Sequence, residues 1–173
     1  MNKNSIDIKK LVLAALFATI GVVSSPLSLH VGVSKVFPVQ HALNIISGII
    51  LGPWYAVASA FVTSLIRNML GTGTPLAFPG SMIGAFLSGY LFLKTKKAFI
   101  ALLGELIGTG LLGAIVSYPI AKLFLGSEEA ALFLFVVPFT LSSLVGVVIG
   151  YVIVNVLREA NVIEYLNESL KFD

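Results

Sequence analysis

The sequence predicts an all-α integral membrane protein with six transmembrane helices, and with the N- and C-termini both in the cytoplasm. Composition is the first reason: hydrophobic residues make up 57% of the 173 residues, charged residues 11%, and the mean hydropathy is +1.01. Soluble domains usually contain about 25% charged residues. The lipid bilayer is therefore the expected solvent, and residues 1–173 are expected to form a single transmembrane domain.

The second reason is the spacing of the apolar runs. A helix that crosses the hydrocarbon core of about 30 Å needs roughly 20 mostly apolar residues. Six such runs are separated by short segments rich in Gly, Pro or Lys, residues that are typical of turns. The predicted spans are residues 11–24, 37–51, 54–70, 80–92, 99–124 and 130–157, of which the second and fourth are short.

The third reason is the distribution of basic residues. Six crossings put both termini on the same side, and Lys and Arg are enriched in cytoplasmic segments. With a cytoplasmic N-terminus, the residues inside are Lys3, Lys9, Lys10, Lys94, Lys96, Lys97, Arg158 and Lys171, and those outside are Lys35, Arg67 and Lys122. This bias supports six spans and makes segments 25–36 and 71–79 external.

Several classes of function are excluded by what the sequence lacks. Cysteine is absent, and the only histidines are His30 and His41, so no cofactor or metal site is expected. The basic residues are scattered between apolar runs and form no patch for nucleic acid. The Gly-Thr segment 71–74 lacks the Lys-Ser/Thr ending of a phosphate-binding loop. No nucleophile and base occur at a recognisable spacing, so an intramembrane enzyme is disfavoured.

A polar stripe in span 37–51 is the first candidate binding surface. Gln40, His41, Asn44 and Ser47 recur at helical spacing, so they share one face that must point into the bundle. A ligand is one use for such a stripe. Hydrogen bonding between neighbouring helices is the other, and the pattern leaves both open.

The outer end of span 54–70 carries two further candidates, Arg67 and Asn68. Arg67 is expected either to contact a ligand or to extend outward to water along its apolar stem. The following segment, 71–79, is rich in Gly and Pro and is predicted to be a re-entrant or tightly folded external loop.

Glu105 is the only acidic residue well inside a predicted span. It is expected to be the floor of a deep pocket, a buried partner for a basic or amide group, or a protonated hydrogen-bond donor. It lies toward the cytoplasmic half, whereas the stripe of span 37–51 begins at the outer end, and this difference in depth argues against one compact site. Thr109, one turn outward, and Tyr118, near the outer end, are weaker candidates.

The external segment 25–36 alternates apolar residues, such as Leu27 and Leu29, with small or polar ones and has no helical period. A cap over a cavity and an ordered crossover both fit this pattern.

Several motifs together resemble a known family. They are Phe37-Pro-Val-Gln-His41, Leu51-Gly-Pro53, the run from Ser64 to Ala85, and Gly104-Glu-Leu-Ile-Gly-Thr-Gly110. The chain resembles the ThiW family, which comprises substrate-binding S components of energy-coupling factor (ECF) transporters, assigned to the thiamine precursor hydroxyethylthiazole.

The resemblance implies an ECF S-component fold in the plasma membrane, with an external pocket capped by segment 25–36. It also implies a transmembrane coupling subunit and two cytoplasmic ATPases as partners. Small residues on the first helix of S components often face the coupling subunit, and Ala14 and Ala18 match them here. Ala15 and Thr19 match nearly as well.

Two alternatives stay open. The same kind of transporter would serve thiamine or its pyrimidine precursor. A stand-alone secondary transporter is the other alternative, although the sequence shows no convincing internal repeat of the kind common in that class.

Overall fold

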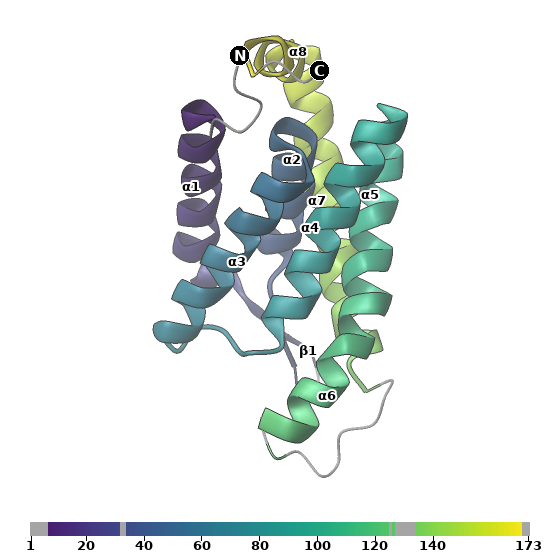
Figure 1. Cartoon of the computed structure of the whole chain (residues 1–173). Helices are drawn as coiled ribbons and strands as arrows, with labels where there is room; N and C mark the ends of the chain where they lie inside the picture. The colour runs from purple at the N-terminus through teal and green to yellow at the C-terminus, as the bar shows by residue number, and fades with distance from the viewer. Residues whose placement is uncertain (1–6, 32–33, 125, 127–133, 171–173) are drawn as a thin grey trace.

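The computed structural model describes residues 7–31, 34–124, 126 and 134–170. They form a bundle of helices with short connections and one small pair of strands (Figure 1). The helices are α1 (Ile8–Val23), α2 (Pro38–Leu51), α3 (Pro53–Met69), α4 (Ala77–Thr95), α5 (Ala98–Ile107), α6 (Ala114–Phe124), α7 (Val136–Glu159) and α8 (Val162–Ser169).

The helices follow the predicted apolar runs closely. α1 to α4 each overlap one predicted span, and α5 and α6 together match span 99–124. The π-helical turn η2 (Gly108–Gly113) joins α5 to α6. α7 lies within span 130–157, whose residues 130–133 lie outside the described part of the chain.

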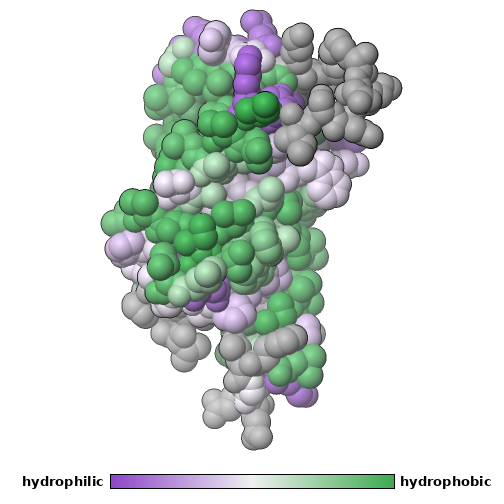
Figure 2. Space-filling model, turned by 60° about the vertical axis from the view of Figure 1, so that its left-hand side comes forward, coloured by the Kyte–Doolittle hydropathy of each residue, from purple (hydrophilic) through white to green (hydrophobic). Residues whose placement is uncertain are grey.

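Two helices in the described part of the chain are long and apolar enough to cross a membrane by themselves. They are the continuous helix Ala98–Leu123 and α7, and α2 is a shorter apolar helix. The face shown in Figure 2 is largely hydrophobic, with hydrophilic residues mainly toward the two ends. Large apolar side chains such as Val12, Leu16 and Val148 are exposed on the surface. Such a surface suits a lipid environment.

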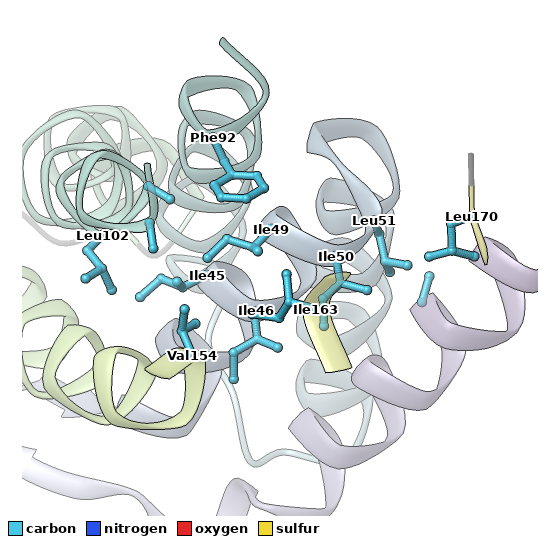
Figure 3. Close-up of a cluster of buried hydrophobic side chains, with 13 residues drawn as sticks. Ile45, Ile46, Ile49, Ile50, Leu51, Phe92, Leu102, Val154, Ile163 and Leu170 are labelled. Atoms are coloured by element: carbon cyan, nitrogen blue, oxygen red, sulfur yellow. The ribbon is translucent and has the colours of Figure 1, made fainter. Parts of the chain in front are cut away.

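The half of the bundle nearest α8 is held together by apolar packing. Ile45, Ile49, Phe92, Leu102 and Val154 meet there, from four helices (Figure 3). α8, which the sequence analysis did not predict, adds Ile163 and its C-cap residue Leu170 to the same cluster.

Glycines allow α2 and α4 to approach closely in this half. A Cβ atom built on Gly48 would lie 2.8 Å from the backbone nitrogen of Gly89. Real Cβ contacts are longer than this, so any larger side chain would push the two backbones apart.

The opposite end of the bundle carries the small strands and the loop after α3 (Figure 1). The 3₁₀ turn η1 (Ser25–Leu27) leads into β1 (Leu29–Val31), which pairs antiparallel with β2 (Ser34–Val36). The Phe37 backbone nitrogen donates to Ser142 Oγ of α7 at 3.0 Å. This bond anchors the chain where α2 begins.

The loop between α3 and α4 is tightly folded. The backbone nitrogens of Thr72 and Gly73 donate to the Arg67 carbonyl oxygen at 2.9 and 3.0 Å. Gly71 has φ +69°, a left-handed conformation that glycine adopts without steric penalty. Of the two forms expected for segment 71–79, this compact one agrees with the structure.

The pair of alanines on α1 faces the interior of the chain. Ala14 and Ala18 are 4% and 3% exposed, and Thr63 Oγ1 of α3 donates to the Ala18 carbonyl oxygen at 3.5 Å. They are therefore unavailable to another subunit unless α1 moves. The other expected pair, Ala15 and Thr19, lies on the exposed face.

Candidate functional site

A cavity of about 160 Å³ lies at the strand end of the bundle. Its walls come from the start of α2, the end of α3, the start of α4, η2 and the start of α7. The residues that line it are Val36, Phe37, Gln40, His41, Arg67, Thr74, Leu76, Ala77, Gly80, Ser81, Thr109, Phe135, Phe139 and Ser142. Four of the sequence-predicted site residues are among them, namely Gln40, His41, Arg67 and Thr109. Two more, Asn44 and Glu105, lie just behind the wall and are hydrogen-bonded to these lining residues.

A chain of hydrogen bonds links four helices beside the cavity. Arg67 Nη1 of α3 donates to Gln40 Oε1 at 3.2 Å, and Gln40 Nε2 donates to Asn44 Oδ1 at 3.4 Å. Asn44 Nδ2 then donates to Glu105 Oε1 of α5 at 3.1 Å and to the Ser81 carbonyl oxygen of α4. The polar stripe of α2 thus makes contacts between helices and also borders the cavity.

Glu105 is fully buried, and one of its oxygens is the centre of this network. In addition to accepting from Asn44, the Oε1 atom lies 2.9 Å from His41 Nδ1 and 2.9 Å from Thr109 Oγ1. The other oxygen, Oε2, lies beside Gly84, where any side chain would clash with it, and has no hydrogen-bond partner among the described residues. Of the three roles expected for Glu105, a buried partner for basic and amide groups fits these contacts.

The expected difference in depth between Glu105 and α2 is wrong. Asn44 lies seven residues before Leu51, the last residue of α2, and Glu105 lies seven residues after Ala98, the first residue of α5. Leu51 and Ala98 belong to one apolar cluster, so both polar residues are about 10 Å into the bundle from the same end. The predicted depth of Asn44 was counted from the outer end of α2. That end itself lies deep in the bundle, because α2 has only 14 residues.

Arg67 does not extend outward to water. Its side chain is 1% exposed, and its Cζ atom lies 3.4 Å from the centre of the Phe37 ring. Nε and Nη2 of this guanidinium have no hydrogen-bond partner in the described part of the chain. A buried cation stacked on an aromatic face is strongly held, and here it supports the ring that lines the cavity.

Two predicted site residues lie away from the cavity. Asn68 Nδ2 donates to the carbonyl oxygens of Ser64 and Thr74, at 2.8 and 3.1 Å, and so fastens the loop after α3. Tyr118 is half-buried on α6, where the Lys122 Nζ atom lies 6.0 Å from its ring. Neither side chain lines the cavity.

Several lining residues were not among the residues predicted from the sequence. Phe37 and Ser81 fall in quoted motifs, which was a usable signal. Phe135, Phe139 and Ser142 gave no signal of their own, because serine and phenylalanine are common throughout such helices and only the packing selects these three.

The arrangement suits the capture of one small ring. Apolar cavities of about 150 Å³ are large enough to bind benzene. Phenylalanine rings supply flat apolar walls, and His41 and its neighbours supply polar atoms that would orient a ligand.

Of the comparisons with known proteins, only the one with family models gives a match. No curated protein and no solved structure matches the chain. The model of one protein family, described as thiamine-precursor transporter protein (ThiW), matches residues 11–160. That is a family of transporters, and membership fits the apolar surface and the long apolar helices described above. Because the match spans most of the sequence, the chain belongs to the ThiW family.

Proposed function

We propose that the chain is the substrate-binding S component of an ECF-type uptake transporter in the plasma membrane, and that it captures hydroxyethylthiazole. The cavity is the observation that carries this proposal, because it is small, largely buried and walled by aromatic and polar side chains. The ligand has about nine heavy atoms, and tight binding of so small a molecule requires contact with nearly every atom. A cavity of about 160 Å³ provides such contact.

The proposed topology has six crossings. They are α1, α2, α3, α4, the rod from α5 to α6, and α7, while α8 packs against the end of the bundle. The described chain begins and ends at the α8 end, which supports an even number of crossings (Figure 1). Three lysines lie at this end of α4, namely Lys94 in its last turn and Lys96 and Lys97 just after it, so this end is the cytoplasmic one by the distribution of basic residues.

This topology makes the cavity open to the outside and gives segment 25–36 the role of a lid. Single cysteines at Ser28 and Thr95 test it in intact cells. A reagent that does not cross membranes should label the Ser28→Cys variant and leave the Thr95→Cys variant unlabelled. Labelling of Thr95→Cys from outside would contradict the six-crossing arrangement.

The proposed partners are a transmembrane coupling subunit and two cytoplasmic ATPases, which would supply the energy for uptake. The exposed face of α1, with Ala15 and Thr19 among apolar neighbours, is the surface we propose for the coupling subunit. This choice replaces Ala14 and Ala18, which are buried within the chain.

The deciding experiment separates binding from energised transport. Purified chain in detergent should bind hydroxyethylthiazole by calorimetry. Cells should accumulate the labelled compound only when the chain is expressed with the coupling subunit and active ATPases, and ATPase variants that bind ATP without hydrolysing it serve as the control. Uptake by the chain alone would instead identify a secondary transporter.

Competition binding separates the remaining ligands. Thiamine contains two rings and the pyrimidine precursor contains a different one, so we expect both to displace hydroxyethylthiazole only weakly from a cavity of this size. Tighter binding of either would reassign the substrate while leaving the transporter class in place.

A further inference from the structure

We propose that His41 presents an unprotonated Nε2 atom to the cavity, fixed in that form by Glu105, and thereby selects ligands that donate a hydrogen bond. The inference rests on the proposed function, which makes the cavity the ligand site. It assigns His41 as a specificity-determining residue and Glu105 as a positioning residue, and it identifies the ligand class as small aromatic alcohols.

The argument begins at Arg67, because a guanidinium can only donate hydrogen bonds. The atom of Gln40 that lies 3.2 Å from Arg67 Nη1 must therefore be the amide oxygen. This fixes the Gln40 nitrogen as the donor to Asn44 Oδ1, and in turn fixes Asn44 Nδ2 as the donor to Glu105. The contact of Asn44 Nδ2 with the Ser81 carbonyl oxygen, an obligate acceptor, requires the same orientation.

Glu105 is consequently the acceptor end of the chain. Its Oε1 atom receives Asn44 Nδ2 and is in contact with His41 Nδ1 and Thr109 Oγ1. A carboxylate oxygen accepts several hydrogen bonds, whereas a protonated oxygen would have to donate one. The unpartnered Oε2 faces Gly84, which offers no acceptor side chain for a proton there.

The charge balance favours the same state. Arg67 is the cation at one end of the chain of amides and Glu105 is the anion at the other. A buried charge needs a compensating partner, and two oriented amides connect these two. With His41 neutral, this part of the site carries no net charge, which suits an uncharged ligand.

A carboxylate at Glu105 determines the tautomer of His41. The 2.9 Å contact requires the proton to be on Nδ1, so the neutral ring carries a lone pair on Nε2. His41 lines the cavity, and Nε2 has no hydrogen-bond partner among the described residues. Only a donor, such as the hydroxyl of a hydroxyethyl group, can complete this contact.

Three ligands test the inference on the purified full chain: hydroxyethylthiazole, its methyl ether and the analogue with a plain ethyl group. The ether keeps the oxygen as an acceptor and carries a methyl group in place of the donated proton, whereas the ethyl analogue lacks the oxygen and adds no bulk. We expect the alcohol to bind about ten- to a hundredfold more tightly than either analogue, because the others leave Nε2 unpaired. Equal affinity of the alcohol and the ether would overturn the inference while leaving the proposed function standing.

Two substitutions of the same histidine provide matched controls. Asparagine in His41→Asn keeps a donor near the position of Nδ1 and lacks an atom at Nε2, so the preference for the alcohol should vanish. Glutamine in His41→Gln extends to the position of Nε2 and should keep part of the preference. If the preference for the alcohol survives in His41→Asn, another group must accept the hydrogen bond from the ligand hydroxyl.

Nitrogen NMR of protein labelled at its histidines identifies the tautomer of His41 in the absence of ligand. The chain has two histidines, so the His41→Asn spectrum assigns the signals. We expect His41 to be protonated on Nδ1 alone, to remain so in Glu105→Gln, and to become a mixture of tautomers in Glu105→Leu. A proton on Nε2 in the unmodified chain would refute the inference. This measurement needs no ligand, so its result is independent of whether hydroxyethylthiazole, the proposed substrate, binds.

Discussion

The two halves of α2 are buried to a similar degree and are held in place by different forces. In the half that starts at Pro38, the residues Gln40, His41 and Asn44 are bonded to three other helices and border the cavity. In the half that ends at Leu51, the side chains of Ile45, Ile46, Ile49 and Ile50 pack in the apolar cluster. One helix therefore joins the half that borders the cavity, which is the proposed binding half, to a packing half.

The difference follows from the solvent. Between membrane helices, apolar side chains gain little from leaving lipid, so the packing half depends on close van der Waals contact. Polar side chains in the same setting need partners, so the binding half depends on directional bonds. Stability and ligand affinity should consequently respond to substitutions in different halves of α2.

The largest expected effect is on stability in the packing half. Ile49→Ala removes a side chain that is 1% exposed, and the cavity left behind should lower the free energy of unfolding by about 2–5 kcal/mol. Ligand affinity should stay within about twofold of the unmodified chain, because Ile49 lies about one turn beyond Asn44 and away from the cavity. Unfolding in mixed detergent and calorimetry measure the two quantities.

Val148→Ala, on the exposed surface of α7, is the control for the loss of an apolar side chain and should change stability little. If Ile49→Ala lost ligand affinity without losing stability, the division of roles between the two halves of α2 would be wrong.

The next effect is on affinity in the binding half. Asn44→Ala removes the donor to Glu105 and the acceptor for Gln40, and should weaken ligand binding about ten- to a hundredfold. Ser47→Ala is the matched control one turn along α2, because among the described residues Ser47 Oγ bonds only to the Asn44 carbonyl oxygen, at 3.2 Å. We expect Ser47→Ala to bind almost normally. If Asn44→Ala only unfolds more easily, with no loss of affinity in the folded fraction, then the polar stripe of α2 serves only to join the helices by hydrogen bonds.

The packing half was more predictable from sequence than the binding half. Hydropathy is a local property, so the apolar runs indicated where the main helices lie. α8 was not predicted, because its eight residues are too few and too mixed in polarity to form an apolar run. Its role in the cluster depends on Ile163 and Leu170 meeting other helices, which no local pattern shows.

The binding half was predicted in its residue types and not in its geometry. Polar residues inside apolar runs are rare, so Gln40, His41, Asn44, Arg67 and Glu105 were recognisable one at a time. Their contact depends on the relative depth of α2 and α5, for which the sequence-based prediction was wrong. The π-helical turn η2, which carries Thr109, likewise has no signal that distinguishes it from ordinary helix.

A smaller effect is expected on the rate of ligand release. Val36 is buried and lines the cavity, whereas its cross-strand partner Leu29 is 56% exposed and does not line it. Val36→Ser should therefore accelerate dissociation several-fold, and Leu29→Ser should not, although the sequence pattern had suggested Leu29 as a covering residue. Stopped-flow release of a labelled ligand measures both rates. Equal rates in the two variants would show that the strands are a crossover and not a lid.

The smallest expected effect lies at the far end of the molecule from the cavity. The Asp7 carboxylate caps α1 by accepting from the backbone nitrogens of Lys9 and Lys10, with Oδ1 at 3.0 and 3.3 Å. Loss of such a cap in Asp7→Ala should lower the free energy of unfolding by about 1 kcal/mol. Asp7→Asn keeps a capping oxygen and should stay close to the unmodified chain, and the bond from the Asp7 backbone nitrogen to the Tyr55 hydroxyl survives in both. Since the packing half separates this cap from the ligand, neither variant should alter affinity, and calorimetry beside detergent unfolding would reveal any coupling between the two ends.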